Sequence, residues 1–249
     1  MLKEERQQKI IDILNIEKKV IASDLSQRFN VSEDTIRRDL KELDSQGSLK
    51  RVHSGALRVG PPITDFTYRE NIDNDRKKNL AVKALSFLKE DSVIIIDGST
   101  TNLALVKEIP IDFRARIITN SPPIAVQLAH HPNIEVINLG GILYKQSMIN
   151  LGVETYKALQ NIRADLYIMG IYNIDIEVGT SVPTLQEAEI KNQMVQISTE
   201  VLGMITNDKF GTISNAIVGS VDDLSFLISE NISDKIRKEY GQKKIILID

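Results

Sequence analysis

Residues 30–40 (NVSEDTIRRDL) constrain the fold of this chain most, because their order is typical of a turn that leads into a helix. Asn30 belongs to one of the few residue types besides glycine that tolerate a left-handed backbone, so it can end one helix and turn the chain. Ser32 can cap the next helix, and Glu33 and Asp34 then fall in its first turn, where carboxylates favour the positive end of the helix dipole. The sequence therefore predicts a turn and a helix that begins after Ser32.

The predicted helix has two different faces. Ile36, Leu40 and Leu43 recur at helical spacing and form an apolar stripe that should face inward. Hydroxyl and guanidinium groups remain for the outer face, and such groups suit DNA because arginine pairs with guanine edges or phosphates and short hydroxyls bond at close approach. Alone, paired arginines beside Asp39 are more typical of an ordinary solvated surface. The candidate DNA contacts on this helix are Ser32, Glu33, Thr35, Arg37 and Arg38.

The segments before this helix complete a helix-turn-helix pattern. Residues 22–29 predict a short helix whose Leu25 and Phe29 lie four residues apart on one buried face. Residues 2–15 predict a supporting first helix, with apolar residues at helical spacing that include Leu2, Ile10 and Leu14. Together they indicate a head of three helices.

A β-hairpin is predicted behind the helices. Residues 47–59 contain short β-prone runs on either side of Ser54 and Gly55, as in the wing of a winged helix, and this wing adds Arg51 and His53 to the candidate DNA contacts. Gly60 and the two prolines after it interrupt regular structure. We therefore expect a winged helix-turn-helix DNA-binding domain at residues 1–59, a linker at 60–72 and an effector-sensing domain at 73–249.

Composition limits the class of protein. With 249 residues, 42% hydrophobic residues and seven prolines, the chain can form two domains with sizeable cores. Cysteine is absent, the N-terminus is charged and the apolar runs are short, so we expect a cytoplasmic protein with no disulfide, signal peptide or membrane span. Residues 1–60 hold 12 Lys and Arg against 10 Asp and Glu, and the remainder holds 19 against 24. This division suits a DNA-binding head on an acidic body.

Strands and helices alternate through the second domain. Alternation at this spacing predicts an α/β fold, with a mostly parallel sheet covered by helices on both faces. The predicted strands are residues 92–97, 116–119, 135–139, 165–169, 201–206, 225–229 and 244–248, and the predicted helices are 73–89, 100–108, 123–130, 153–161, 185–200 and 233–240.

Polar turns at the ends of these strands predict a ligand site. Ligands of open α/β sheets bind beyond the carboxyl ends of the strands, and residues 97–101 (DGSTT) follow the first strand and run into a helix. Glycine for a tight turn, hydroxyls and a helix start together suit a phosphate group. Each turn taken singly is as typical of an ordinary strand-to-helix connection, but four such turns at one edge favour a ligand. The candidate effector contacts are Asp97, Gly98, Ser99, Thr100, Thr101, Asn120, Gly140, Gly141 and Lys209.

Other chemistries find little support in the sequence. Neither a P-loop nor a dinucleotide-binding glycine pattern occurs, which disfavours nucleotide hydrolysis. His130 and His131 are adjacent and would point in different directions, and Glu187 and Glu189 lie two residues apart, a spacing that does not share a helix face. We predict no catalytic residues, no metal site and no cofactor.

The motifs resemble those of the DeoR family of bacterial transcriptional repressors. Residues 29–40, Gly47 and residues 51–56 resemble its DNA-binding head, although Asn30 and Ser54 stand where the family usually has glycine. Residues 97–101, 119–120, 140–141, 187–194 and 208–211 are similar to successive motifs of its sensor domain, whereas residues 170–174 and 206–208 depart from the usual pattern. The resemblance implies a sensor fold related to ribose-5-phosphate isomerase and glucosamine-6-phosphate deaminase that binds phosphorylated sugars. By motif, it assigns effector contacts to Asp97, Ser99, Thr100, Thr101, Asn120 and Lys209.

The leading interpretation is a repressor of sugar-metabolism genes, a homodimer or higher homo-oligomer that binds double-stranded operator DNA and responds to a small phosphorylated sugar. A sugar-phosphate isomerase or deaminase with an appended helix-turn-helix is the alternative, because fold does not fix function. A head that binds protein rather than DNA is a third interpretation.

Overall fold

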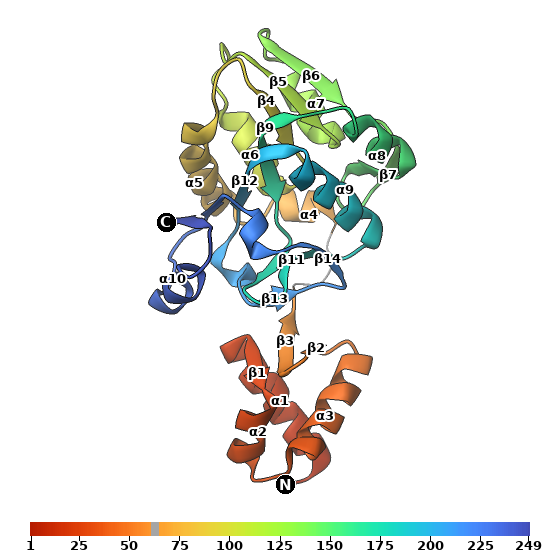
Figure 1. Ribbon diagram of the computed structural model, residues 1–249, viewed down its shortest axis with the longest axis vertical. Helices are drawn as coiled ribbons and strands as arrows, with labels where there is room; N and C mark the ends of the chain where they lie inside the picture. Colours follow the sequence, from red (N-terminus) through yellow and green to blue (C-terminus); the bar gives the residue numbers. More distant parts are fainter. Residues whose placement is uncertain (61–64) are drawn as a thin grey trace.

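The computed structural model describes residues 1–60 and 65–249. Figure 1 shows a small head, formed by the N-terminal part of the chain, at one end of an elongated molecule and a larger α/β body at the other. The sequence predicts that regular structure is interrupted at residues 60–62, and the two prolines of this range lie outside the described residues. Among the helices of the described ranges, none combines the length and the apolarity that crossing a bilayer requires.

The head contains the three predicted helices and a small sheet. Buried side chains from all three helices, among them Ile10, Leu14, Leu25, Ile36, Leu40 and Leu43, form a core of its own. Leu2 does not belong to this core, because it precedes the first helix and is 74% exposed. The elements of the head are α1 (Lys3–Glu17), β1 (Lys19–Ile21), α2 (Ala22–Phe29), α3 (Glu33–Ser45), β2 (Lys50–Val52) and β3 (Gly55–Val59), of which β1 was not predicted.

The turn between α2 and α3 has the predicted chemistry. Asn30 adopts a left-handed conformation with φ 51° and ψ 50°, and it ends α2. The side chain of Ser32 accepts a hydrogen bond from the backbone N–H of Thr35 at 3.2 Å, which satisfies one of the N–H groups that a helix start leaves unpaired. Both predictions are confirmed.

The predicted hairpin is also present. Strands β2 and β3 are antiparallel, and Val52 pairs with Gly55 across the two-residue loop of His53 and Ser54. Gly55 is required because a Cβ there would lie 1.9 Å from the carbonyl oxygen of Val20 on β1, which pairs with β3 on its other side. The absence of a side chain thus lets the three strands approach.

The body is built on seven parallel strands, as the alternation predicts. Their order is β16-β15-β12-β9-β4-β5-β6. The strands are β4 (Val93–Ile96), β5 (Ala115–Thr119), β6 (Ile134–Asn138), β9 (Ala164–Gly170), β12 (Ser198–Met204), β15 (Phe226–Ile228) and β16 (Ile246–Ile248).

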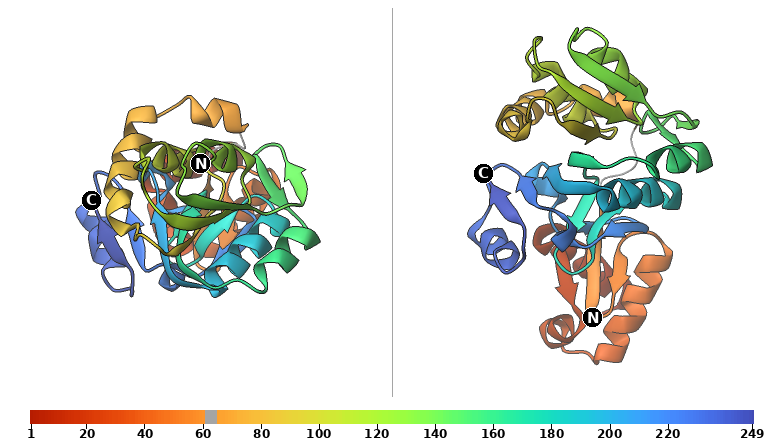
Figure 2. Two further views of the ribbon diagram at one scale, coloured as in Figure 1. Left: turned by 90° about the horizontal axis from the view of Figure 1, so that it is seen from above. Right: turned by 45° about the horizontal axis from the view of Figure 1, so that its top comes forward.

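Helices cover both faces of this sheet. Buried residues of α4 (Phe66–Glu70), α5 (Asn74–Ala84), α6 (Thr100–Glu108) and α7 (Pro122–Leu128) pack on one face in a single cluster. Those of α8 (Val153–Leu159), α9 (Leu185–Gln196) and α10 (Asp234–Tyr240) pack on the other. The view from above in Figure 2 shows α4 and α5 on one side of the sheet and α8 and α9 on the other.

Several boundaries and elements differ from the sequence predictions. Helix α5 ends at Ala84 and continues as the short 3-10 turn η1 (Leu85–Phe87), and α9 ends at Gln196, because β12 already pairs with β9 from Ser198 onward. Short strands that carry no strong periodicity were missed. They include the hairpin β7 (Ile142–Tyr144) and β8 (Ile149–Leu151) and the sheet of β10 (Asn173–Asp175), β11 (Gly179–Val182) and β14 (Ala216–Gly219).

The range 60–72, expected as a linker, contains regular structure. Within it lies α4, whose Phe66 is only 5% exposed in the core of the body. Asp65 caps this helix by accepting a hydrogen bond from the backbone N–H of Tyr68 at 2.7 Å. The second half of the range therefore belongs structurally to the body.

Head and body are joined by backbone pairing as well as by the chain itself. Strand β3 of the head lies parallel to β13 (Thr212–Ile213) of the body, and Arg58 pairs with Thr212. Two lysines of the head add contacts: Lys18 Nζ donates to the carbonyl of Asn207 at 3.1 Å, and Lys19 Nζ lies 2.6 Å from a carboxylate oxygen of Glu177. Asn207 opens the 3-10 turn η2 (Asn207–Lys209).

Candidate functional site

The predicted DNA-reading residues lie on the surface of the head. Ser32, Glu33, Arg37 and Arg38 are exposed on the first turns of α3, Thr35 is half-buried, and Arg51 and His53 are exposed on the hairpin. The guanidinium of Arg37 lies 3.1 Å from the carboxylate of Glu33, a contact between exposed groups that DNA can replace at little cost. The surface offers the guanidinium and hydroxyl groups that DNA recognition uses.

Asp39 has a different role from the one its position beside the arginines suggested. It is 2% exposed, and its two carboxylate oxygens accept hydrogen bonds from Arg6 of α1 at 2.5 and 3.1 Å. This bidentate ion pair ties α3 to α1. Asp39 thus neutralises a buried arginine and leaves the exposed arginines of α3 to other partners.

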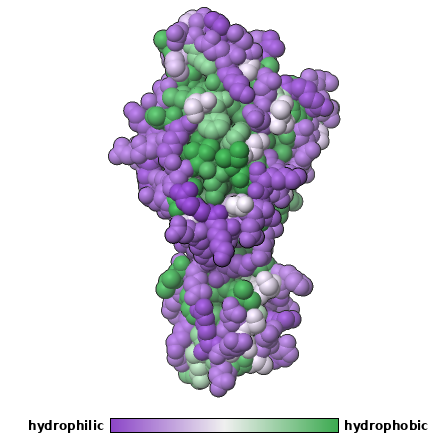
Figure 3. All heavy atoms as spheres, turned by 60° about the vertical axis from the view of Figure 1, so that its left-hand side comes forward, coloured by the Kyte–Doolittle hydropathy of each residue, from purple (hydrophilic) through white to green (hydrophobic). Residues whose placement is uncertain are grey.

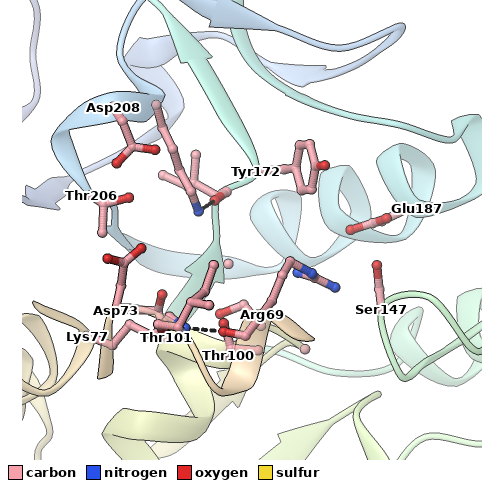
Figure 4. A pocket seen from close by; sticks show the side chains of 16 residues that line it. Arg69, Asp73, Lys77, Thr100, Thr101, Ser147, Tyr172, Glu187, Thr206 and Asp208 are labelled. Atoms are coloured by element: carbon pink, nitrogen blue, oxygen red, sulfur yellow. Dashed lines mark hydrogen bonds between the residues drawn. The ribbon is translucent and has the colours of Figure 1, made fainter. Parts of the chain in front are cut away.

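A cavity of about 150 Å³, lined largely by polar and charged residues, lies at the carboxyl edge of the sheet. Its walls come from α4, α5, the start of α6, the β7–β8 hairpin, the end of β9, α9 and η2, as Figure 4 shows for the labelled side chains. The residues that line it are Arg69, Ile72, Asp73, Lys77, Gly98, Ser99, Thr100, Thr101, Ser147, Gly170, Ile171, Tyr172, Glu187, Thr206, Asp208 and Lys209.

The predicted turn after β4 forms one wall of this cavity. Ser99 caps α6, and its side chain accepts a hydrogen bond from the backbone N–H of Asn102 at 2.9 Å. Thr100 and Thr101 follow on the first turn. Gly98 and Gly170 let the backbones come close, since a Cβ at Gly98 would lie 2.1 Å from Ile149 and one at Gly170 would lie 2.7 Å from Ser99. The N-terminus of α6, the threonine hydroxyls and the backbone exposed at the glycines together can bind an anion.

Three basic side chains line the same cavity. Lys209 Nζ donates to the carbonyl of Ile171 at 2.7 Å, and Lys77 Nζ donates to the carbonyls of Ile72, at 2.6 Å, and Arg69. A guanidinium nitrogen of Arg69 donates to the carbonyl of Gln146 at 2.9 Å. Burial lowers the pKa of Lys209 to about 8 and also lowers the pKa of Lys77. Desolvated cations of this kind gain most from an anionic ligand.

Acidic side chains lie among these cations. Asp73, Glu187 and Asp208 line the cavity, and burial raises the pKa of Glu187. Arg76 joins the walls by contacting Asp73 at 3.4 Å and Asp208 at 3.2 Å. A cavity with both signs of charge suits a ligand that carries an anionic group and several hydrogen-bond donors.

Asp97 supports the cavity from behind. Its Oδ1 accepts hydrogen bonds from the backbone N–H of Gly170 at 2.6 Å and from the amide of Asn102 at 2.9 Å. Its Oδ2 accepts hydrogen bonds from the Tyr167 hydroxyl and the Lys191 ammonium. Asp97 is 1% exposed and does not line the cavity, so the structure gives it no direct access to a ligand there.

Three other predicted contacts also lie outside the cavity wall. Asn120 donates to the carbonyl of Asn150 at 3.1 Å, and the carbonyl of Gly140 accepts a hydrogen bond from Thr155 at 2.6 Å. A Cβ at Gly141 would lie 2.3 Å from the Thr155 hydroxyl oxygen. These residues hold the β7–β8 hairpin and α8 against the ends of β5 and β6. The cavity therefore collects Gly98, Ser99, Thr100, Thr101 and Lys209 of the predicted set.

Sequence reasoning missed the contribution of α4 and α5. Arg69, Asp73 and Lys77 precede the first strand of the sheet, so the rule that ligands bind after strands did not point to them. The position of Glu187 was not predicted either, because its two-residue spacing from Glu189 indicates no pair of carboxylates on one helix face. The one available signal was the polar segment before α5, which the sequence also allows as a linker.

A winged helix-turn-helix head, joined to a parallel-sheet domain with a polar cavity, defines a DNA-binding transcriptional regulator with a sensor domain. Comparison with known families agrees with this class: residues 6–60 match the DeoR-like helix-turn-helix domain, and residues 72–231 match the DeoR C terminal sensor domain. The chain belongs to the DeoR family of transcriptional regulators.

Full-length relatives are regulators as well. The chain is 33% identical over 233 residues to the uncharacterized HTH-type transcriptional regulator YulB of Bacillus subtilis, covering 93% of this chain and 90% of that protein. It is 33% identical to the regulator GolR of Listeria innocua, covering 96% and 94%, and 29% identical to the L-fucose operon activator of Escherichia coli, covering 92% and 96%. The chain is thus a regulator and not an enzyme.

Among solved structures, the chain is similar to ribose 5-phosphate isomerase A from Neisseria gonorrhoeae. The TM-score is 0.40 and the sequence identity 14%, and the similarity covers 56% of this chain. It spans about half of the isomerase, 54% of its length.

Proposed function

We propose that the chain represses sugar-metabolism genes and that a phosphorylated sugar in the cavity controls it. One observation carries this proposal: the capped N-terminus of α6, the hydroxyl groups of its first turn and the basic residues Lys77 and Lys209 all line one cavity. A phosphate group can accept hydrogen bonds from the first N–H groups of α6 and from Thr100 and Thr101, with a lysine beside it.

The rest of the cavity suits a sugar. Asp73, Asp208 and Ser147 offer acceptors at its rim, and sugar hydroxyls are good donors to such groups. The Escherichia coli relative is named as an activator of an L-fucose operon, which supports control of sugar genes in this family. Repression rather than activation is our proposal for this chain.

The proposed DNA contacts are the seven exposed or half-buried residues of α3 and the hairpin described above. We further propose a homodimer, because two tethered heads raise the effective concentration of the second contact and so compensate for the few basic residues in each head. Figure 3 shows apolar side chains gathered on the side of the body that carries α5, and the exposed apolar residues of the body include Val82 of α5 and Ile246 of β16. An exposed apolar area of this kind supports self-association.

Fluorescence anisotropy on DNA from the region upstream of the chain's own gene, with scrambled DNA for comparison, tests the proposal. We expect specific binding that a pool of sugar phosphates weakens. Specific binding that no sugar phosphate alters would refute the effector, and turnover of a pooled sugar phosphate by the purified protein would revive the enzyme alternative. If the pool of sugar phosphates strengthened DNA binding, the proposal that the effector releases the protein from DNA would be contradicted.

Substitution of the reading arginines tests the DNA-binding surface. Arg37→Ala or Arg38→Ala should weaken operator binding by about 1 to 3 kcal/mol where the residue pairs with a base. Arg114→Ala on the body is the control, because Arg114 is exposed and pairs only with neighbouring carboxylates in the described structure. Wild-type affinity in both α3 variants would exclude this face as the reader.

A further inference from the structure

Glu187 is a buried acid with an unsatisfied oxygen. It lies on the first turn of α9, lines the cavity and is 5% exposed. Within the described part of the chain, its Oε2 atom is buried and has no hydrogen-bond partner. A buried polar atom without a partner is costly, so such an atom on a side chain that lines a cavity points to a missing ligand group.

The capping of α9 does not use this carboxyl group. Thr184 already caps the helix by accepting a hydrogen bond from the backbone N–H of Glu187 at 3.3 Å. Lys191, one turn further along, donates instead to Asp97 and, at 2.7 Å, to the carbonyl of Gly170. An apolar side chain at this position would preserve the helix and avoid the buried acid.

The surroundings favour a neutral donor as the partner of Glu187. Lys191 and Arg69 both act on its carboxyl group electrostatically, and Asp97 is the acidic neighbour. An ammonium group on the ligand would therefore be repelled by two cations, whereas a neutral hydroxyl would not be repelled. Figure 4 shows Glu187 and Ser147 on one side of the cavity and Asp73, Lys77 and Asp208 on the other, so a ligand that spans the cavity can hold its phosphate away from Glu187.

We propose that Glu187 determines the specificity of the sensor, by accepting a hydrogen bond from a hydroxyl of the effector at the end of the cavity away from its phosphate. This inference rests on the proposed function, because it takes the effector to be a phosphorylated sugar. The α6 turn then recognises the phosphate shared by all such sugars. Glu187 distinguishes among them by the position of a hydroxyl, since a buried acceptor disfavours an analogue that lacks the donor.

Isothermal titration of the full-length protein tests the assignment. The probes are inorganic phosphate, ribose 5-phosphate, fructose 6-phosphate and glucose 6-phosphate, with deoxy analogues of the sugar phosphate that binds most tightly. Glu187→Met removes the acceptor at similar volume, and Glu189→Gln, two residues along the same helix on its exposed side, is the matched control.

We expect Glu187→Met to raise the Kd of that sugar phosphate about 10- to 100-fold, the usual range for a hydrogen bond to a charged group. The Kd of inorganic phosphate should not change, and one deoxy analogue should bind wild type and Glu187→Met equally. Because the carboxyl group is unsatisfied without ligand, the Tm of the ligand-free variant should equal or exceed that of wild type. Glu189→Gln should behave as wild type throughout.

Three results would overturn the inference, and they separate it from the proposed function. An unchanged preference for the sugar phosphate over inorganic phosphate in Glu187→Met would exclude Glu187 while leaving the effector class in place. Equal weakening of both probes, with a lower Tm, would show that Glu187 only supports the cavity. If wild type binds no sugar phosphate more tightly than inorganic phosphate, the effector class itself fails and the role of Glu187 fails with it.

Discussion

At the scale of single residues, local chemistry determined what the sequence could predict. Asn30 and Ser32 were predicted correctly because a left-handed turn and a helix cap depend on the residue and its immediate neighbours. The burial of Glu187 and Asp39 could not be predicted, because it depends on what the fold places opposite them. A two-residue spacing says nothing about a cavity, and a position beside arginines says nothing about Arg6, which lies 33 residues away.

The protonation of Lys209 gives a prediction about pH. Burial lowers its pKa to about 8 from the ordinary 10.5, so the ammonium group is charged at pH 7 and loses its proton as the pH rises through 8. The phosphate of a sugar phosphate remains a dianion over this range, whereas Lys209 loses its charge. The Kd of the sugar phosphate should therefore rise about tenfold between pH 7 and pH 9.

Titration calorimetry at several pH values measures this effect. Lys209→Met should bind the sugar phosphate more weakly at pH 7, and its Kd should change much less with pH. An equally steep slope in Lys209→Met would show that Lys209 does not contact the anion.

The buried ion pair of Arg6 and Asp39 gives a prediction about stability. Asp39→Ala leaves the Arg6 guanidinium buried without its carboxylate, which typically costs about 3 to 5 kcal/mol. We expect the free energy of unfolding of the head, measured by thermal or urea denaturation, to fall by this amount. The double variant Arg6→Met with Asp39→Leu removes both charges and should recover most of the loss; a double variant as unstable as Asp39→Ala would argue against the pair as the cause.

At the scale of elements, the repeating pattern of the body was predictable and its exceptions were not. All seven strands of the parallel sheet were expected, because apolar strands and amphipathic helices alternate along the chain. The strands of the β7–β8 hairpin have three residues each, which is too short for an alternation of apolar and polar residues to be recognised in the sequence. This hairpin explains why Asn120, Gly140 and Gly141 serve packing rather than the cavity.

The turn η2 connects the cavity with the head. Asp208 and Lys209 line the cavity, the carbonyl of Asn207 accepts a hydrogen bond from Lys18 of the head, and Gly211 leads directly into β13, which pairs with β3. A ligand that moves Lys209 therefore acts on the segment that holds the head. Such coupling requires that the effector bind one arrangement of the two parts better than the other.

Gly211→Ala tests this connection without touching either site. Gly211 has φ 67°, and a Cβ there would lie 3.3 Å from the Cβ of Lys18, so alanine should strain the junction by about 1 to 2 kcal/mol. We expect a changed ratio of operator affinities with and without effector, measured by anisotropy, and an unchanged Kd of the sugar phosphate in the absence of DNA. Gly140→Ala is the control, since a Cβ there meets no atom within 4 Å; a wild-type affinity ratio in Gly211→Ala would place the coupling elsewhere.

At the scale of the whole molecule, the head has the means to fold by itself but not to regulate by itself. Its core contains ten buried apolar residues of its own, and the described part of the chain joins it to the body through the β3–β13 pairing and contacts that include those of Lys18 and Lys19. The cavity lies entirely in the body. Operator recognition, tethering and effector response are therefore separable in experiment.

A fragment of residues 1–60 tests this separation. We expect the fragment to fold, but to bind the operator at least about 100-fold more weakly than the full chain, because the second head no longer binds at a high effective concentration. Fusion of the fragment to an unrelated dimeric coiled coil should restore most of the affinity, as measured by anisotropy, without restoring any response to sugar phosphate. If the fragment alone bound as tightly as the full chain, the dimer would be unnecessary for recognition; if the fusion responded to the sugar, the effector would act on the head and not through the cavity.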